Sequence, residues 1–139
     1  MTTKLAALRS VPLFQGMSDH SVESIAELAA DASFAAGAIL VREGDPGDSF
    51  LIIREGSATV EQGGNTVREL GSGDFLGEIS LIDGRPRTAT VIASRPVDAW
   101  TIDRAGFTRL MDEYPSVRYE LLNALTQRIQ SSAPASPLD

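Results

Sequence analysis

The central part of the chain, from Phe34 to Asp103, is a series of short apolar runs separated by glycine-rich turns. The turns recur about every eight to twelve residues, which is the spacing of strands in an antiparallel β-sandwich or barrel. We expect strands at Ala38–Arg42, Phe50–Glu55, Ser57–Gln62, Thr66–Leu70, Thr88–Ala93 and Val97–Ile102. No segment repeats at a fixed period, which argues against a propeller or a solenoid. Turn geometry accounts for Gly44, Gly47, Gly56, Gly63 and Gly64.

The segments on either side of these strands have the spacing of helices. Residues 1–31 are expected to be helical, with Ser18 as the N-cap of a helix whose apolar side chains recur at three- and four-residue intervals. Beyond the strands, Asp103 is placed to cap one helix, and Pro115 suits the first position of a second. The expected fold class is therefore mainly β with flanking helices, an antiparallel β-barrel with an N-terminal helix and two C-terminal helices.

The length and charge of the chain limit what it can be. Its 139 residues suit one domain, placed at residues 1–130, and a tail at 131–139 that is rich in serine, alanine and proline and expected to be disordered. Twelve basic against nineteen acidic residues give a net charge of −7. This charge would repel a phosphate backbone over most of the surface, so no nucleic-acid partner is expected, although one small anion pocket is compatible with it.

Residue types that are scarce in the chain exclude several kinds of site. There is no cysteine and one histidine, His20, so disulfides, thiolate metal sites and multi-histidine metal sites are excluded. No apolar run approaches the ~20 residues of a membrane span, and the first residues lack the apolar core of a signal peptide. We expect a cytoplasmic protein with no membrane segment.

One stretch, Gly73–Val91, does not fit the strand pattern. It contains about one helical turn, expected from Glu78 to Ile82 and entered through Gly77. A helix N-terminus attracts anions, and a glycine there lets a ligand approach the backbone closely. Ten residues later, Arg87 could hold a phosphate with two parallel hydrogen bonds, whereas Glu78 would accept from a sugar hydroxyl. These residues fit a small ligand with one phosphate and a ribose; an Arg87 paired only with a neighbouring carboxylate is the structural alternative.

Two parts of this stretch resemble a known motif. They read Phe75-Leu76-Gly77-Glu78-Ile79-Ser80-Leu81 and Pro86-Arg87-Thr88-Ala89-Thr90-Val91. Together they are similar to the phosphate-binding cassette of the cyclic-nucleotide-binding domain family, whose members include catabolite-activator-like sensors. The family's spacing is also present in Val11-Pro12-Leu13-Phe14, in residues 43–50 and in Glu55-Gly56. The resemblance covers roughly residues 5–130 and implies a jelly roll.

The resemblance also implies roles for individual residues. Arg87 would pair with the cyclic phosphate, and Glu78 would accept from the ribose 2′-hydroxyl. The expected ligand-binding residues are Gly77, Glu78, Ile79, Ser80, Arg87, Thr88 and Ala89. A residue of the last helix would cap the base, and the candidates are Leu121, Leu122 and Leu125. We expect cAMP as the ligand with cGMP as the alternative, since a hydroxyl at Thr88 is compatible with either.

The expected function is reversible binding of the nucleotide, which signals by moving the C-terminal helices. We expect no enzymatic activity, no bound metal and no cofactor besides this ligand. The carboxylates are scattered over turns, and His20 has no second histidine grouped with it. The expected form is a stand-alone sensor that acts on an effector protein in trans, and a homodimer is compatible with it. Two alternatives stay open: a sensor detached from a transcription factor or channel, and a scaffold or dimerisation module whose pocket has drifted.

Overall fold

The computed structural model describes residues 4–46, 49–77 and 86–131, with side chains in the last helix described as far as Asn123. The helices at the start of the chain are α1 (Lys4–Arg9), the 3₁₀ helix η1 (Pro12–Phe14) and α2 (Asp19–Leu28). The strands are β1 (Ala30–Phe34), β2 (Ile39–Val41), β3 (Ser49–Glu55), β4 (Ala58–Gln62), β5 (Asn65–Leu70), β6 (Phe75–Leu76), β7 (Thr90–Ala93) and β8 (Val97–Asp103). The last two helices are α4 (Arg104–Glu113) and α5 (Pro115–Ser131).

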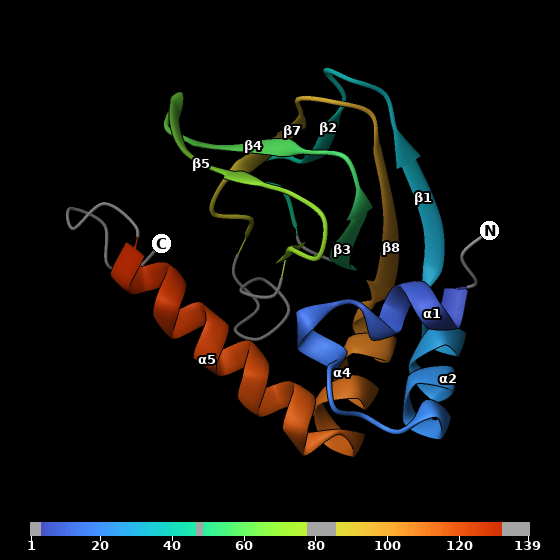
Figure 1. Ribbon diagram of the computed structural model, residues 1–139. Helices are drawn as coiled ribbons and strands as arrows, with labels where there is room; N and C mark the ends of the chain where they lie inside the picture. Colours follow the sequence, from blue (N-terminus) through green and yellow to red (C-terminus); the bar gives the residue numbers. More distant parts are fainter. Residues whose placement is uncertain (1–3, 47–48, 78–85, 132–139) are drawn as a thin grey trace.

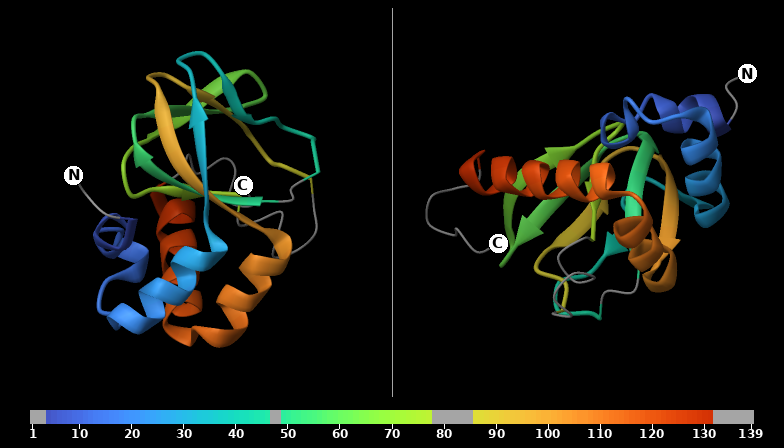
Figure 2. Two further views of the ribbon diagram at one scale, coloured as in Figure 1. Left: turned by 90° about the vertical axis from the view of Figure 1, so that its right-hand side faces the viewer. Right: turned by 90° about the horizontal axis from the view of Figure 1, so that it is seen from below.

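The described strands form two four-stranded sheets, in the orders β1-β8-β3-β6 and β2-β7-β4-β5, and every pairing is antiparallel. Helices α1, α2 and α4 lie together at one end of the strands (Figures 1 and 2). The expected fold class is confirmed: the protein is a mainly β jelly roll with N-terminal helices and two C-terminal helices. None of the described helices is long and apolar enough to cross a membrane.

The helix boundaries that were expected from capping residues are confirmed. The Ser18 hydroxyl accepts a hydrogen bond from the Ser21 amide at 3.1 Å and caps α2. The Asp103 carboxylate accepts from the Gly106 amide at 2.8 Å and caps α4. Helix α5 begins at Pro115, whose missing amide hydrogen costs nothing at that position.

The strands differ from the expected pattern in three places. Residues 1–31 are not all helical, because α2 ends at Leu28 and β1 begins at Ala30, paired with Thr101 of β8. The alanines around this point favour a helix by propensity, and pairing with β8 overrides that preference. The two-residue strand β6 was not expected. The strand expected from Thr88 begins at Thr90 instead, which leaves Thr88 and Ala89 outside the sheet.

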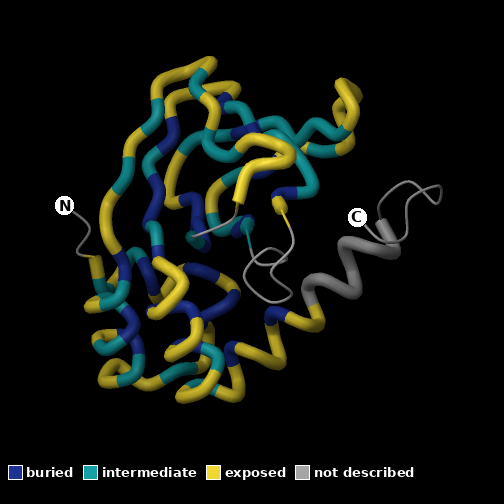
Figure 3. The backbone as a smooth tube through the Cα atoms, turned by 180° about the vertical axis from the view of Figure 1, so that it is seen from behind, coloured by how far each residue is buried: buried dark blue, intermediate teal, exposed yellow. Residues whose placement is uncertain are grey.

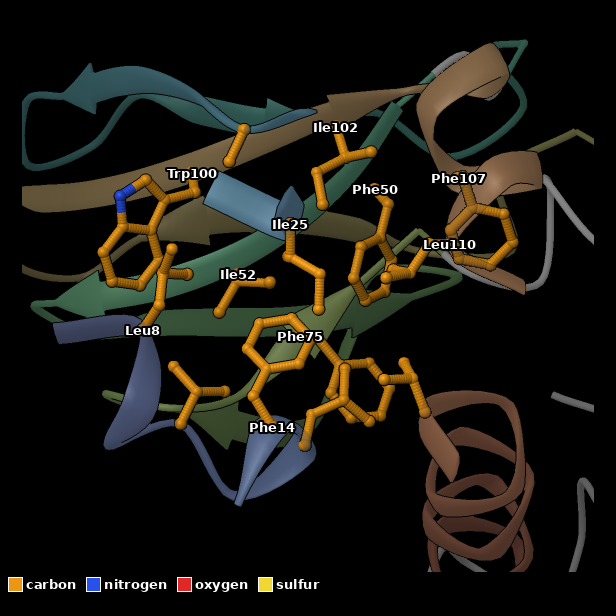
Figure 4. Close-up of a cluster of buried hydrophobic side chains, with 14 of the residues drawn as sticks. Leu8, Phe14, Ile25, Phe50, Ile52, Phe75, Trp100, Ile102, Phe107 and Leu110 are labelled. Carbon is orange, nitrogen blue, oxygen red and sulfur yellow. The ribbon is translucent and has the colours of Figure 1, made fainter. Parts of the chain in front are cut away.

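Two apolar cores lie on opposite faces of β3, because successive side chains of a strand point to opposite sides. Phe50 and Ile52 point toward the helices, and Leu51 and Ile53 belong to a separate cluster that includes residues of both sheets. We call the first the helix-side core; Figure 4 shows it between helices and strands. Its residues are Leu8, Val11, Leu13, Phe14, Val22, Ile25, Ala29, Phe50, Ile52, Phe75, Trp100, Ile102, Phe107, Leu110, Val117 and Leu121. Figure 3 shows exposed positions along α5 and at the tip of the β4–β5 hairpin.

Candidate ligand-binding site around Arg87

Arg87 is the one buried charged side chain among the residues that the structure describes, with 8% of its surface exposed. It lies just before β7, and its guanidinium Nη2 donates a hydrogen bond to the backbone carbonyl of Ser49 at 2.8 Å. Burying a charged group is costly unless hydrogen bonds compensate for the lost water. A planar guanidinium has five N–H donors in a rigid fork that suits a carboxylate or a phosphate. The fold therefore holds a strong anion-binding group in a fixed place.

Gly77 packs directly against this guanidinium. Its φ of +95° lies in the region that favours glycine, and a Cβ atom there would overlap Nη1 of Arg87 and lie 2.6 Å from the Ser49 carbonyl oxygen. The pairing of Leu51 with Leu76 brings the end of β6 alongside the start of β3, which explains why Gly77 and Ser49 meet. Three segments distant in the sequence thus converge on one guanidinium.

The turn after β2 holds the backbone of Arg87. The Arg87 amide donates to the carbonyl of Asp45 at 2.8 Å, and the Gly44 amide donates to the carbonyl of Arg87 at 2.9 Å. The Glu43 amide also donates to Oγ1 of Thr90 at 2.9 Å. Both backbone groups of Arg87 are therefore bonded, although the residue lies outside any strand.

An open cavity of about 390 Å³ borders Arg87, which is within the range of small-molecule sites. Its lining combines residues of β2 with two cations and one carboxylate. The lining residues are Ile39, Leu40, Val41, Arg42, Asp45, Pro46, Ser49 and Arg87. In the part of the chain that the structure describes, no group of three or more His, Asp or Glu side chains could hold a metal ion. Such a cavity, with two arginines and one carboxylate in its lining, can bind a small anion.

The expected site residues divide into three groups. Gly77 and Arg87 are in contact, and Thr88 and Ala89 follow Arg87 as partly buried residues before β7. Glu78, Ile79 and Ser80, together with the helical turn expected at Glu78–Ile82, lie outside the described residues.

The three candidates for capping the base lie on α5 and have different surroundings. Leu121 is fully buried in the helix-side core beside Val117, whereas Leu122 is 52% exposed. The side chain of Leu125 lies outside the described part of the helix, as do residues 132–139 of the expected tail. Capping by any of the three stays a prediction.

Sequence reasoning missed the partners of Arg87. Ser49 contributes a backbone carbonyl, and a backbone acceptor leaves no signal in the residue type. Gly44 and Asp45 were interpreted as plain turn residues, and they do form a turn, but this turn also holds the Arg87 backbone. The contact follows from the pairing of β2 with β7, which brings the segment after β2 alongside the segment before β7.

Comparisons with known proteins identify the family of the chain. The chain matches the family model described as "Cyclic nucleotide-binding domain" over residues 32–114. The cAMP-dependent protein kinase regulatory subunit of Colletotrichum orbiculare is 33% identical over 106 residues, which is 75% of this chain and 27% of that protein. The cGMP-dependent protein kinase isozyme 1 of Drosophila melanogaster is 38% identical over 114 residues, 76% of this chain and 15% of that protein. The chain thus spans about a quarter or less of the length of these two relatives.

A solved structure extends the likeness to three dimensions. The regulatory domain of Toxoplasma gondii PKA, solved with cAMP, superposes with a TM-score of 0.79 and 32% sequence identity over 88% of this chain and 48% of that chain. The family model matches more than half of this chain, and Arg87 and Gly77 both lie inside the match. The chain therefore belongs to the cyclic nucleotide-binding domain family.

Proposed function

We propose that this chain binds a cyclic nucleotide, with cAMP preferred over cGMP, and that the cyclic phosphate binds at Arg87. The observation that carries the proposal is the buried guanidinium of Arg87, which packs on Gly77 beside an open cavity. Charge-assisted hydrogen bonds in such a partly dry place contribute about 1.5–3 kcal/mol each. The absence of a side chain at Gly77 lets the guanidinium lie directly against the backbone there.

The other parts of the nucleotide are assigned by the family's motif. Glu78 would accept from the ribose 2′-hydroxyl, and the segment Gly77–Ser80 would lie against the sugar and phosphate. Thr88 and Ala89 follow Arg87 directly and would contribute a hydroxyl and an amide. Relatives named for cAMP and for cGMP both match this chain, so the titration compares the two nucleotides directly.

Binding at Arg87 would be transmitted to the C-terminal helices through β3. Ser49, which accepts the guanidinium hydrogen bond, is the first residue of β3, and it pairs with Asp103 at the end of β8. Asp103 is the N-cap of α4, which leads into α5. A ligand that pulls on the Arg87 guanidinium would therefore shift the population of α4 and α5 positions. The module would regulate an attached or separate effector and would not act as an enzyme.

Calorimetric titration of nucleotide-stripped protein with cAMP, cGMP and 5′-AMP tests the proposal. We expect saturable binding of cAMP, weaker binding of cGMP and no binding of 5′-AMP. Arg87→Ala should weaken cAMP binding by about tenfold to a hundredfold or more, since each lost charge-assisted bond contributes about 1.5–3 kcal/mol. Arg95→Ala is the matched control, because Arg95 is an exposed arginine in the turn between β7 and β8. Equal binding by the parent and Arg87→Ala would contradict the proposal.

A second candidate function, a dimerisation module, is favoured by one observation. Tyr119 and Leu122 of α5 are 69% and 52% exposed and lie three residues apart, so they share one face of the helix. Light scattering with and without cAMP distinguishes the two functions. A dimer in the absence of calorimetric binding would favour the module, whereas a nucleotide-binding monomer would exclude it.

A further inference from the structure

We propose that the side chains of Glu43 and Gln62 position Arg87 for its ligand, an inference that rests on the proposed binding role of Arg87. Neither residue belongs to the segment that carries Arg87. Glu43 lies in the turn after β2, and Gln62 is the last residue of β4, at the β4–β5 hairpin. The Gln62 side chain bonds to the Arg87 segment directly, and the Glu43 carboxylate bonds to the hairpin next to Gln62.

The segment from Arg87 to Ala89 needs such support because it lies outside the sheet. Strand β7 begins at Thr90, so the ladder bonds that fix a strand start only after the functional residue. A guanidinium at the end of a long side chain is positioned only as well as the backbone from which it extends. An ångström of displacement is enough to break a hydrogen bond to a phosphate.

Gln62 supports this segment from the hairpin side. Its side-chain amide Nε2 donates to the backbone carbonyl of Thr88 at 3.1 Å, across 26 residues of sequence, and the bond is partly buried. Thr88 is the residue directly after Arg87. The bond therefore fixes the peptide group between Thr88 and Ala89, one residue beyond Arg87, which β7 does not reach.

Glu43 supports the same segment from the turn after β2. Its amide donates to Oγ1 of Thr90, and its carboxylate Oε1 accepts from the amide of Gly63 at 3.1 Å. Gly63 follows Gln62 in the hairpin. The bonds thus close a ring from Arg87 through the turn and the hairpin back to Thr88. We call Glu43, Gly44, Asp45, Gln62 and Gly63 the Arg87 frame.

The direction in which cAMP affinity changes shows whether the Glu43 carboxylate acts by positioning Arg87 or by repelling the phosphate. A carboxylate close to an anion site repels the anion, so removal of the Glu43 charge alone should strengthen phosphate binding. If the carboxylate acts by holding the turn, its removal should weaken binding instead. Glu43→Gln distinguishes the two, because it keeps an oxygen acceptor for the Gly63 amide and loses the charge.

The experiment measures cAMP affinity in five variants of the full chain. Gln62→Ala and Glu43→Ala should each weaken binding about threefold to tenfold, the range of one net hydrogen bond. Glu43→Gln should bind as tightly as the parent or more tightly. Gln15→Ala and Glu23→Ala are matched controls, because both side chains are exposed on the N-terminal helical region and should leave the affinity unchanged. Unchanged or tighter binding by Glu43→Ala and Gln62→Ala would overturn the inference.

A double-mutant cycle shows that the effect acts through Arg87. In an Arg87→Lys background, which keeps the charge but loses the fork, Gln62→Ala should change the affinity less than about twofold, because the guanidinium that it positions is gone; the two substitutions are then strongly non-additive. Full additivity in this background would contradict a positioning role.

A measurement without ligand separates this inference from the proposed function. Amide hydrogen exchange at Arg87 and Gly44 should become faster in Glu43→Ala and Gln62→Ala and stay as in the parent in Gln15→Ala. Faster exchange with no cAMP binding in any protein would contradict the proposed function and support the frame. Unchanged exchange would overturn the frame whatever the nucleotide does.

Discussion

The helix-side core and the Arg87 frame hold their parts of the molecule together by different means. The core is a continuous apolar cluster from α1 to α5, with Trp100, Phe14 and Phe50 almost fully buried. The frame is a set of hydrogen bonds among turns, and Glu43, Gly44 and Asp45 are exposed. Burial of apolar area dominates the free energy of folding, whereas single hydrogen bonds add little to it but fix position closely. Stability and ligand binding should therefore respond to different substitutions.

The largest effect is expected in the core. Trp100→Ala should lower the free energy of unfolding by about 3–5 kcal/mol, because it removes a fully buried aromatic side chain and leaves a cavity. Urea denaturation followed by circular dichroism measures this loss. The cAMP affinity of the fraction that remains folded should be unchanged, since Trp100 lies in the helix-side core and is not among the described residues that line the cavity at Arg87. Trp100→Phe keeps most of the packing and should lose less. A Trp100→Ala protein that stays folded but binds cAMP at least tenfold more weakly would break the division between the two regions.

A substitution at Gly77 should affect binding more than stability. Gly77→Ala places a methyl group on the Arg87 guanidinium and the Ser49 carbonyl, so the guanidinium must move. We expect cAMP binding to weaken about tenfold or more, the effect of one lost charge-assisted bond, and unfolding to become about 1–2 kcal/mol easier because of the positive φ.

Gly37→Ala is the matched control for this substitution. Its φ of +88° imposes a similar backbone strain, but nothing lies within 4 Å of the added methyl group. The control should lose stability and keep its affinity in the same calorimetric titration. Equal losses of affinity in the two variants would mean that backbone strain, and not contact with Arg87, governs binding.

The smallest effect is expected at a helix cap far from the site. Ser18→Ala removes the hydroxyl that caps α2 and should destabilise the protein by about 0.5–2 kcal/mol without changing cAMP affinity. Thermal unfolding monitored by circular dichroism measures the change, and Ser18→Asp should restore the cap. A drop in affinity for Ser18→Ala would show that the N-terminal helices take part in binding.

What the sequence could predict differs between the same two regions. Periodicity and caps such as Ser18 and Asp103 were sufficient for most of the helices and strands that surround the core, because such signals are local. Strand β1 was missed because Ala30 and Ala32 suit a helix until β8 pairs with them. Gly77 and Arg87 could be assigned to one site from the sequence, because both belong to the same motif. The Ser49 carbonyl and the side chains of Glu43 and Gln62 could not, because their contacts depend on how three segments meet in space.

Nuclear magnetic resonance during a cAMP titration tests the central claim most directly. The Nε–Hε signal of Arg87 reports on the proposed phosphate site, and the indole signal of Trp100, the chain's one tryptophan, reports on the helix-side core. We predict that the Arg87 signal shifts and saturates at one equivalent of cAMP while the indole signal moves far less. An Arg87 signal that stays unchanged while other signals saturate would contradict binding of the phosphate at Arg87.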